Sequence, residues 1–433
     1  VELDGIRDRV VRLTPNSSNL GDAILSQDGE NLYYLCSFEG GMDLWKMALR
    51  SKETKLVSKG AGSGHFDTAD KGKTIFLLGS GFKKMDGDKF TPIPVSCEYK
   101  LDHRAEREYM FDYVCKEEQK RFYTSDMHGV DWPGMTAAYR KFLPHISNNA
   151  DFAELLSELL GELNVSHTGG RFRAPAAEDA TASLGLLYDM EYGGPGLKVA
   201  EIVKDGPFDH ASLKLKVGDI ITAINGKEIT DDKDVSAFLA GLSGKKTLVQ
   251  TKRGKEFVVI PVSASKMSDL LYRRWVKQRA ADVEKWSAGR LGYVHIESMN
   301  DGSFRPMYSD VLGKYNKCDG IVIDTRFNGG GRMHEDIEIL FSGHKYLTQV
   351  IRGRESCDMP SRRWNKPSIM LQCEANYSNA HGTPWVYSHE KIGSLVGAPV
   401  PGTMTSVNWV TLQDPSLVFG IPVIGYRTAE GNY

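Results

Sequence analysis

The sequence lacks the features that mark metal, nucleotide and membrane proteins. Its six cysteines are scattered, with no CxxC pair, and no histidine-rich spacing suits a metal. No apolar run is long enough to cross a bilayer, and no block of like charges accompanies the net charge of −2. We therefore expect no metal or organic cofactor, no nucleic acid and no membrane as partners.

Length and composition are those of an ordinary globular protein. The chain has 433 residues, of which 41% are hydrophobic and 25% charged. That is too long for one compact core, so we expect three or four domains. The first residue is Val1, and it stands inside what looks like a repeat, so we expect a fragment of a longer protein whose sequence does not reveal its localisation.

The first 95 residues predict an all-β region. A turn followed by an aromatic strand at 26–35 recurs at 69–78, about 43 residues later. This period is typical of four-stranded propeller blades, and two blades are only part of a propeller. The alternative is a plain β-meander. Residues 96–178 then predict a helical domain, because the apolar residues of 152–160 follow helical spacing after a capping segment at 149–151.

Residues 179–266 predict a small β-domain with a recognisable order of elements. Gly218-Asp219 precedes the apolar strand 220–224, and Asn225-Gly226 supplies a tight turn. This order resembles a PDZ domain, against the alternative of an unrelated small β-domain. The resemblance implies that Leu184, Gly185 and Leu186 form the lip that takes a peptide.

Residues 267–433 predict an α/β domain. The run 320–324 is continuously apolar, as in a parallel strand buried on both faces, and 368–371 is a second such strand. Helices are expected at 275–286 and 304–315. Ser378 follows the second strand, where open sheets place their ligands.

Two short segments combine into chemistry for acyl transfer. Ser378 is a candidate nucleophile in a polar turn, and His167 is a candidate general base whose ring Ser166 could fix. The amide of Asn379 would point into the same site. The non-catalytic alternatives are a solvated turn serine and a surface histidine. His381 and His389 are competing candidates for the base because they are near Ser378 in sequence.

A glycine triplet after the strand 320–324 offers further amides. Gly329 or Gly330 could donate the second hydrogen bond to an oxyanion, because glycine allows a reacting carbonyl to approach closely. No Lys-Ser/Thr pair follows Gly331 and no GxGxxG is present, so a phosphate cradle is not indicated. We interpret Asp324 and Arg326 as structural.

The segments 159–170, 324–331, 374–379 and 399–405 together resemble tricorn protease and its homologues, within the carboxy-terminal processing peptidases. The resemblance covers essentially the whole chain and implies a serine endopeptidase acting on peptides or unfolded chains. It implies Ser378 as nucleophile, His167 as base, Ser166 as the linking hydroxyl, and the amides of Asn379 and Gly329 or Gly330 as oxyanion donors. It also implies a cytoplasmic protein and a possible homo-oligomer.

Two positions depart from that family pattern. The family has aspartate after the nucleophile, where this chain has Asn379. The family glutamate that would complete the site falls beyond Tyr433, and Glu430 sits in what reads as a turn. We therefore predict that this fragment is weakened or inactive.

Two other functions remain open. A serine–lysine dyad would require Lys391, which follows Ser378 by 13 residues, a spacing shorter than that dyad needs. A peptide-binding scaffold would use the PDZ and propeller regions and keep the serine site as a vestige.

Overall fold

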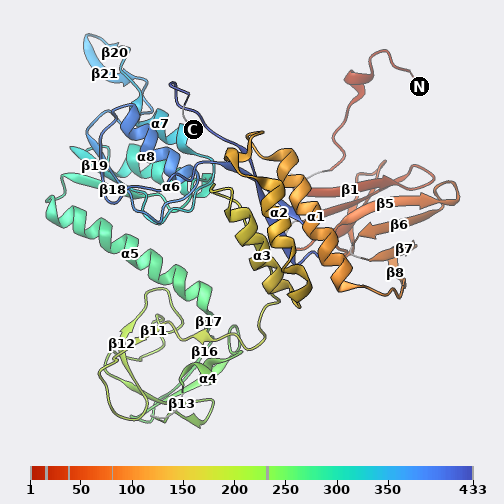
Figure 1. Cartoon of the computed structure of the whole chain (residues 1–433), viewed down its shortest axis with the longest axis horizontal. Helices are drawn as coiled ribbons and strands as arrows, with labels where there is room; N and C mark the ends of the chain where they lie inside the picture. The colour runs from red at the N-terminus through yellow and green to blue at the C-terminus, as the bar shows by residue number, and fades with distance from the viewer. Residues whose placement is uncertain (1, 15–17, 38–39, 80, 231–233, 432–433) are drawn as a thin grey trace. The chain divides into compact units, whose positions relative to one another are not determined.

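The computed structural model describes residues 2–14, 18–37, 40–79, 81–230 and 234–431, and these form two compact units that divide after Leu101. The first unit is all-β (Figure 1). It holds two four-stranded antiparallel sheets in meander order, β1-β2-β3-β4 and β5-β6-β7-β8. Their bounds are Asn19–Leu25, Asn31–Ser37, Asp43–Ala48, Thr54–Ser58, Gly64–Ala69, Thr74–Gly79, Phe82–Asp86 and Lys89–Ile93.

The expected repeat is confirmed by these sheets. The aromatic strands β2 and β6 begin 43 residues apart, at Asn31 and Thr74, and each is the second strand of its sheet. Alternating side chains of both strands enter one core, which includes Leu35, Leu44 and Leu77. Each sheet is thus a blade-like unit of a partial propeller.

The second unit begins with three helices, α1 (His103–Arg121), α2 (Trp132–Arg140) and α3 (Asn149–Gly161). Helix α3 confirms the predicted apolar face, which is buried along its length, and Asn148 caps it by accepting a hydrogen bond from the Asp151 amide. Two short 3₁₀ segments, Met127–Gly129 and Leu143–His145, separate the helices. The chain then leaves α3 towards Ser166 and His167.

Strands from the far end of the chain complete this helical region. β25 (Leu417–Ile424) pairs with β24 (Ser406–Thr411) and with β9 (Gly170–Phe172). Its side chains Leu417, Phe419 and Ile421 lie in the same core as α1 and α3. The structure differs here from the expected range 267–433 for the α/β domain, because strand pairing joins segments that are more than 230 residues apart in sequence.

The PDZ region is a sheet with strand order β11-β12-β13-β15-β16, in which β11 occupies one edge. Asn225 and Gly226 both have positive φ in the β13–β14 hairpin, as the predicted tight turn requires. The bounds are β10 Ala182–Ser183, β11 Leu186–Tyr188, β12 Leu197–Ile202, β13 Ile220–Ile224, β14 Lys227–Glu228, α4 Ser236–Leu239, β15 Thr247–Thr251, β16 Glu256–Val259 and β17 Val262–Ser263.

The α/β region has the parallel four-stranded sheet β18-β19-β22-β23. The strands are Leu291–His295, Gly320–Asp324, Ser368–Leu371 and Ser394–Val396, and β19 is buried throughout, as its apolar run predicts. Its helices are α5 (Ala264–Trp286), α6 (Asp301–Ser309) with a π segment (Asp310–Lys314), α7 (His334–Ser342) and α8 (Asn379–His389). The hairpin β20–β21 (Leu347–Ile351, Arg354–Met359) branches from it (Figure 1).

Both expected helices of this region are present with different ends. α5 begins at Ala264, eleven residues before the predicted start, because Ser263 caps it by accepting a bond from the Lys266 amide. The predicted helix 304–315 begins at Asp301, where Asn300 caps it. Among the described residues, no helix is both long and apolar enough to span a membrane.

Candidate active site

Ser378 stands between β22 and α8, as the N-cap residue of α8. Its backbone has φ 57° and ψ −126°, a conformation that non-glycine residues adopt rarely and that is held only where the surroundings demand it. The Ser378 amide donates to Thr403 Oγ1 at 3.1 Å. The turn therefore presents the serine at the end of a helix, beside backbone amides of the first helical turn.

A strap of residues 326–331 passes directly over this serine. Gly330 has φ +100°, and a Cβ added there would lie 2.6 Å from Ser378 Cβ and 3.1 Å from the Asn379 nitrogen. No other residue type fits such an approach. The glycine triplet thus lets the strap backbone lie against Ser378.

Asn328 holds the strap in place. It is fully buried, and its Nδ2 donates to the Ile296 carbonyl at 2.8 Å. Its Oδ1 accepts from the Gly330 amide at 2.8 Å, and its carbonyl accepts from the Tyr377 amide at 3.0 Å. Of the two predicted glycine donors, Gly330 therefore already uses its N–H within the strap.

His167 comes from the loop after α3 and lies beside Tyr377, the residue that precedes Ser378. Its backbone amide donates to the Tyr377 hydroxyl at 2.8 Å, and the two rings are 4.7 Å apart. Burial, assisted by the nearby Arg171 guanidinium, lowers the pKa of His167 below its ordinary value. The imidazole is accordingly uncharged at neutral pH.

Two hydroxyl groups surround His167 Nδ1. Ser166 Oγ lies 3.0 Å and Thr405 Oγ1 3.1 Å from that nitrogen, and the two oxygens are 2.6 Å apart. Thr405 Oγ1 also donates to the Ser166 carbonyl at 3.0 Å, so its lone pairs face the Ser166 hydroxyl and His167 Nδ1. This arrangement suits a proton on Nδ1, which leaves Nε2 free to accept one.

The short segment 403–405 connects both halves of the site, because Thr403 binds the Ser378 amide and Thr405 binds His167. Sequence reasoning included this segment among the stretches that resemble the family and gave it no role. Thr403, Thr405, Tyr377 and Asn328 were all missed as site residues. The signal available was their position inside the four matching segments.

Asn379 places both its backbone and its side chain at the site. Its amide belongs to the first turn of α8, where helical amides lack an intrahelical acceptor. Its Oδ1 accepts from the amides of Met333 at 2.8 Å and His334 at 3.1 Å. The side chain, which the sequence argument left without a function, therefore caps α7.

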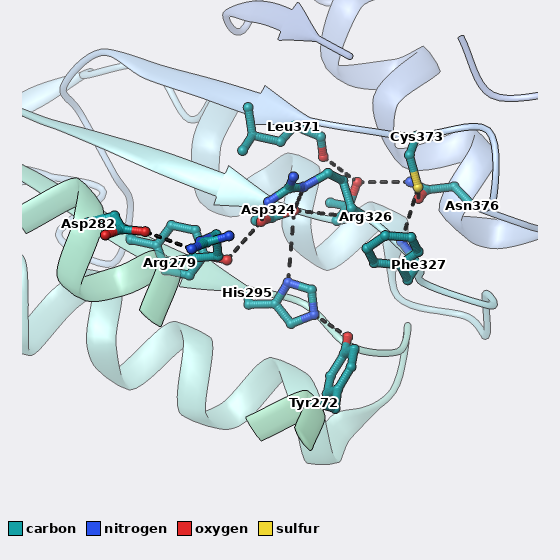
Figure 2. Close-up of polar contacts among 12 residues, drawn as sticks. Tyr272, Arg279, Asp282, His295, Asp324, Arg326, Phe327, Leu371, Cys373 and Asn376 are labelled. Atoms are coloured by element: carbon teal, nitrogen blue, oxygen red, sulfur yellow. Dashed lines mark hydrogen bonds and ion pairs between the residues drawn. The ribbon is translucent and has the colours of Figure 1, made fainter. Parts of the chain in front are cut away.

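A buried polar network surrounds Asp324 (Figure 2). Asp324 is fully buried and accepts from Arg326 Nε at 2.9 Å and Nη2 at 2.6 Å, and from the Tyr293 hydroxyl at 2.7 Å. His295 lies next to Asp324 and bonds to the Tyr272 hydroxyl of α5. The structural interpretation of Asp324 and Arg326 fits this geometry, since their ion pair anchors the first residue of the strap.

The competing residues of the sequence analysis lie elsewhere or are occupied. His381 Nδ1 accepts from the Thr403 amide at 3.3 Å, and His389 is an exposed residue stacked on Trp385. Lys391 follows α8 at its far end, and eleven helical residues separate the two ends of that helix by about 16 Å. Glu430, the last acidic residue of the chain, is exposed. The Ser166 hydroxyl, which the family glutamate would bind, contacts His167 and Thr405 instead.

Two cavities bear on ligand binding. One of about 340 Å³ lies beside Ser378 and Asn379, between the start of α7 and residues 404–406. The other, of about 710 Å³, lies in the PDZ region and is lined by Leu184, Tyr188, Lys198 and Leu239 among others. Leu186 is buried in the PDZ core, and the Gly185 amide donates to Ser183 Oγ at 3.1 Å. Among the described residues, no group of three or more His, Cys, Asp and Glu side chains could hold a metal.

Profiles of known domain families match three parts of the chain. Residues 103–161 match the tricorn protease C1 domain and residues 198–253 a PDZ domain. Residues 290–433, which include the strap and Ser378, match peptidase family S41. The chain therefore contains a domain of peptidase family S41 and resembles the tricorn proteases.

Curated relatives agree with the domain matches. It is 25% identical to a Sulfurisphaera tokodaii protein named as a tricorn-like protease C-terminal subunit, over 94% of this chain and 50% of that one. It is 27% identical to tricorn protease homolog 1 of Streptomyces coelicolor, over 82% of this chain and 35% of that one.

The fold agrees with that of a solved structure. The crystal structure of the tricorn protease matches with a TM-score of 0.74 at 15% identity, covering 93% of this chain and 42% of that one. The expected fold class, a β-rich region followed by a helical region, a PDZ domain and an α/β region, is therefore confirmed. The chain spans half or less of the length of these three relatives.

Proposed function

We propose that this chain is the catalytic core of a serine endopeptidase that hydrolyses peptides or unfolded polypeptides. The observation that carries the proposal is the convergence of three distant segments on Ser378. The serine occupies a strained turn, the glycine strap lies against it, and the segment 403–405 binds both its amide and the ring of His167.

His167 acts as the general base in this proposal. With the proton on Nδ1 directed at the two hydroxyl oxygens, Nε2 takes the proton of Ser378 Oγ as that oxygen attacks the substrate carbonyl. The same proton then passes to the leaving amine as the peptide C–N bond breaks. Thr405 is thus a second positioning residue beside Ser166, and both hold one ring orientation.

The oxyanion formed in the attack requires hydrogen-bond donors on the side of the substrate carbonyl opposite His167. The Asn379 amide, in the first turn of α8, is one donor, and the positive end of the helix dipole adds to it. Because the Gly330 amide already donates to Asn328, Gly329 is the better second donor of the two expected glycines. Water then hydrolyses the acyl-enzyme by the reverse sequence of proton transfers.

The PDZ region supplies a peptide-binding groove. β11 is an edge strand, and the cavity of about 710 Å³ lies between residues 181–198 and α4. An extended peptide can add to such an edge through backbone hydrogen bonds, while its side chains enter the cavity. Leu184 lines this cavity and belongs, like Leu186, to the buried core of the PDZ region.

Assembly into a homo-oligomer is a further part of the proposal. The β20–β21 hairpin is a separate two-stranded sheet, and Leu347, Val350 and Ile351 on it are each about 60% exposed. An isolated hairpin of this kind is marginally stable unless another surface covers it. Light scattering after size exclusion should show a mass above 48.1 kDa, and Val350→Lys should reduce it.

Labelling with a serine-directed fluorophosphonate tests the proposed chemistry. We expect weak covalent labelling of the wild-type chain, because the family glutamate is not among its residues, and complete loss of labelling in Ser378→Ala. Hydrolysis of a fluorogenic peptide should fall by roughly 10⁴- to 10⁶-fold in Ser378→Ala or His167→Ala. Glu430→Gln and Lys391→Ala serve as controls and should both retain labelling.

The outcomes separate the alternatives. Loss of labelling in Lys391→Ala, with labelling retained in His167→Ala, would replace the proposal by a serine–lysine dyad. Equal labelling of the wild type and Ser378→Ala, together with peptide binding to the PDZ region, would favour a scaffold with a vestigial site.

A further inference from the structure

The side chain of Asn379 fixes the protonation of a second histidine next to the nucleophile. Two backbone amides, from Met333 and His334, point at Asn379 Oδ1. The reverse amide orientation would set an NH₂ group against these two N–H donors, so the oxygen must lie there. Consequently Nδ2, which can only donate, faces His334 Nδ1 at 2.7 Å.

This contact determines the tautomer of His334. Because Nδ1 accepts the Asn379 hydrogen bond, it carries no proton, and the neutral ring must carry its proton on Nε2. His334 is thereby held as a hydrogen-bond donor at Nε2. His334 and His167 thus have opposite assignments, since His167 is arranged to accept a proton at Nε2.

His334 lines the cavity of about 340 Å³ that also reaches Ser378. The charged groups of this cavity, Arg332, Glu335 and Asp336, are exposed, whereas His334 is half-buried. Exposed charges are screened by solvent and discriminate weakly between ligands. Among the titratable side chains that the structure places around this cavity, His334 is the half-buried one, and its ring is an uncharged N–H donor.

We infer that His334 selects the substrate residue next to the scissile bond, in favour of side chains that carry an uncharged hydrogen-bond acceptor, such as glutamine or asparagine. The inference rests on the proposed peptidase function and names the substrate class of that site. A lysine side chain would meet a donor instead of an acceptor. A glutamate side chain would enter past two carboxylates and only one guanidinium.

Asn379→Asp gives a sharp perturbation, because aspartate keeps the oxygen that caps α7. Its second carboxylate oxygen would face His334 Nδ1, and that nitrogen must then carry a proton. The ring becomes either an imidazolium or a tautomer whose Nε2 accepts. The backbone amide at position 379 is unchanged.

The first experiment is NMR of the intact chain labelled with ¹⁵N-histidine, which needs no catalytic activity. The His334 signals, identified by their loss in His334→Ala, should show a protonated Nε2 and an unprotonated Nδ1. In Asn379→Asp, Nδ1 should become protonated. A proton on Nδ1 of His334 in the wild type would overturn the inference.

The second experiment measures kcat/KM for peptides that carry glutamine, methionine, lysine or glutamate at each position flanking the cleaved bond. At one of them we expect glutamine to exceed methionine and lysine by roughly tenfold. His334→Ala should abolish this preference. Asn379→Asp should narrow the difference in kcat/KM between the glutamine and lysine peptides. The exposed His145→Ala is the matched control and should keep it.

The role of His334 and the peptidase function can be contradicted separately. Equal cleavage of the four peptides, at both positions, would contradict the role of His334 and leave the peptidase intact. Absence of cleavage and of fluorophosphonate labelling would contradict the peptidase function, and the NMR result would still judge the His334 tautomer.

Discussion

Two carboxyl groups, Asp324 in the α/β region and Glu118 in α1, are equally buried, with no exposed surface, yet they differ in charge. Burial alone raises the pKa of Asp324, but the bonds from Arg326 and Tyr293 outweigh it and lower that pKa below its ordinary value. Burial raises the pKa of Glu118 to about 8, against a weaker opposing effect of Arg121. The partners of a buried acid, more than its depth, decide whether it is ionised.

The same contrast extends to the two halves of the site. On the α/β side, a charged pair anchors the strap that covers Ser378. On the helical side, neutral hydroxyl groups hold His167. A fixed charge suits a strap that must not move, whereas a base that gains and loses a proton is better held by groups that can adjust their hydrogen atoms.

Removing the buried counter-charge of the partly exposed Arg326 guanidinium should have the largest effect. Asp324→Asn leaves the Arg326 guanidinium without its counter-charge, and we expect a loss of about 3–5 kcal/mol in the free energy of unfolding. Urea denaturation measures it. Asp319→Asn, which breaks the exposed pair with Arg290, should cost about 0–1 kcal/mol. Equal losses in the two variants would refute the contrast.

The unpartnered carboxyl predicts a pH-dependent stability. In the part of the chain that the structure describes, neither oxygen of Glu118 has a hydrogen-bond partner. Because the folded-state pKa of Glu118 is raised, its favourable contribution to the free energy of unfolding is complete below pH 4.5. That contribution is lost as pH rises through about 8.

Glu118→Gln should remove that dependence. Its stability relative to wild type should increase between pH 4.5 and 8, on the order of a few kcal/mol. Thermal unfolding across this range is the measurement. Glu117→Gln, which alters a partly exposed pair with Arg121, is the matched control and should not reproduce the trend.

The hydroxyl cluster predicts a smaller effect on catalysis. Thr405→Val removes one of two oxygens at His167 Nδ1 and should cost about 1 kcal/mol, or roughly fivefold in the fluorophosphonate labelling rate. Ser166→Ala should behave similarly, and the double variant should lose more than the sum, because no acceptor remains. Thr411→Val, an exposed threonine of β24, should label at the wild-type rate. If the loss of the double variant equals the sum of the two single losses in free energy, the two hydroxyls act separately.

The smallest effect concerns the pH profile. Since burial and Arg171 lower the pKa of His167, the acidic limb of the labelling rate should fall below pH 6.5. Arg171→Gln removes the smaller cause and should move that limb to higher pH. Arg173→Gln, two residues further on, should leave it in place. A limb unchanged in both variants would assign the shift to burial alone.

Local patterns predicted much of the fold. The apolar spacing of α3 and the continuous apolar run of β19 each identified their element, and the Asn225-Gly226 pair identified a hairpin. Element ends were less accurate, as with α5, because its cap at Ser263 lies upstream of the apolar pattern. Within the site, Ser378, His167 and Ser166 could be named because they stand in segments that resemble a known family.

The sequence by itself determined the elements and the residue types available for acyl transfer, because helical spacing, strand alternation and glycine turns are local properties. The tertiary structure alone brought β24 and β25 to β9, and with them Thr405 to His167 and Thr403 to Ser378. It also paired Asn379 with His334 across 45 residues. These contacts depend on strand pairing and core packing between distant segments, which no local pattern in the chain encodes.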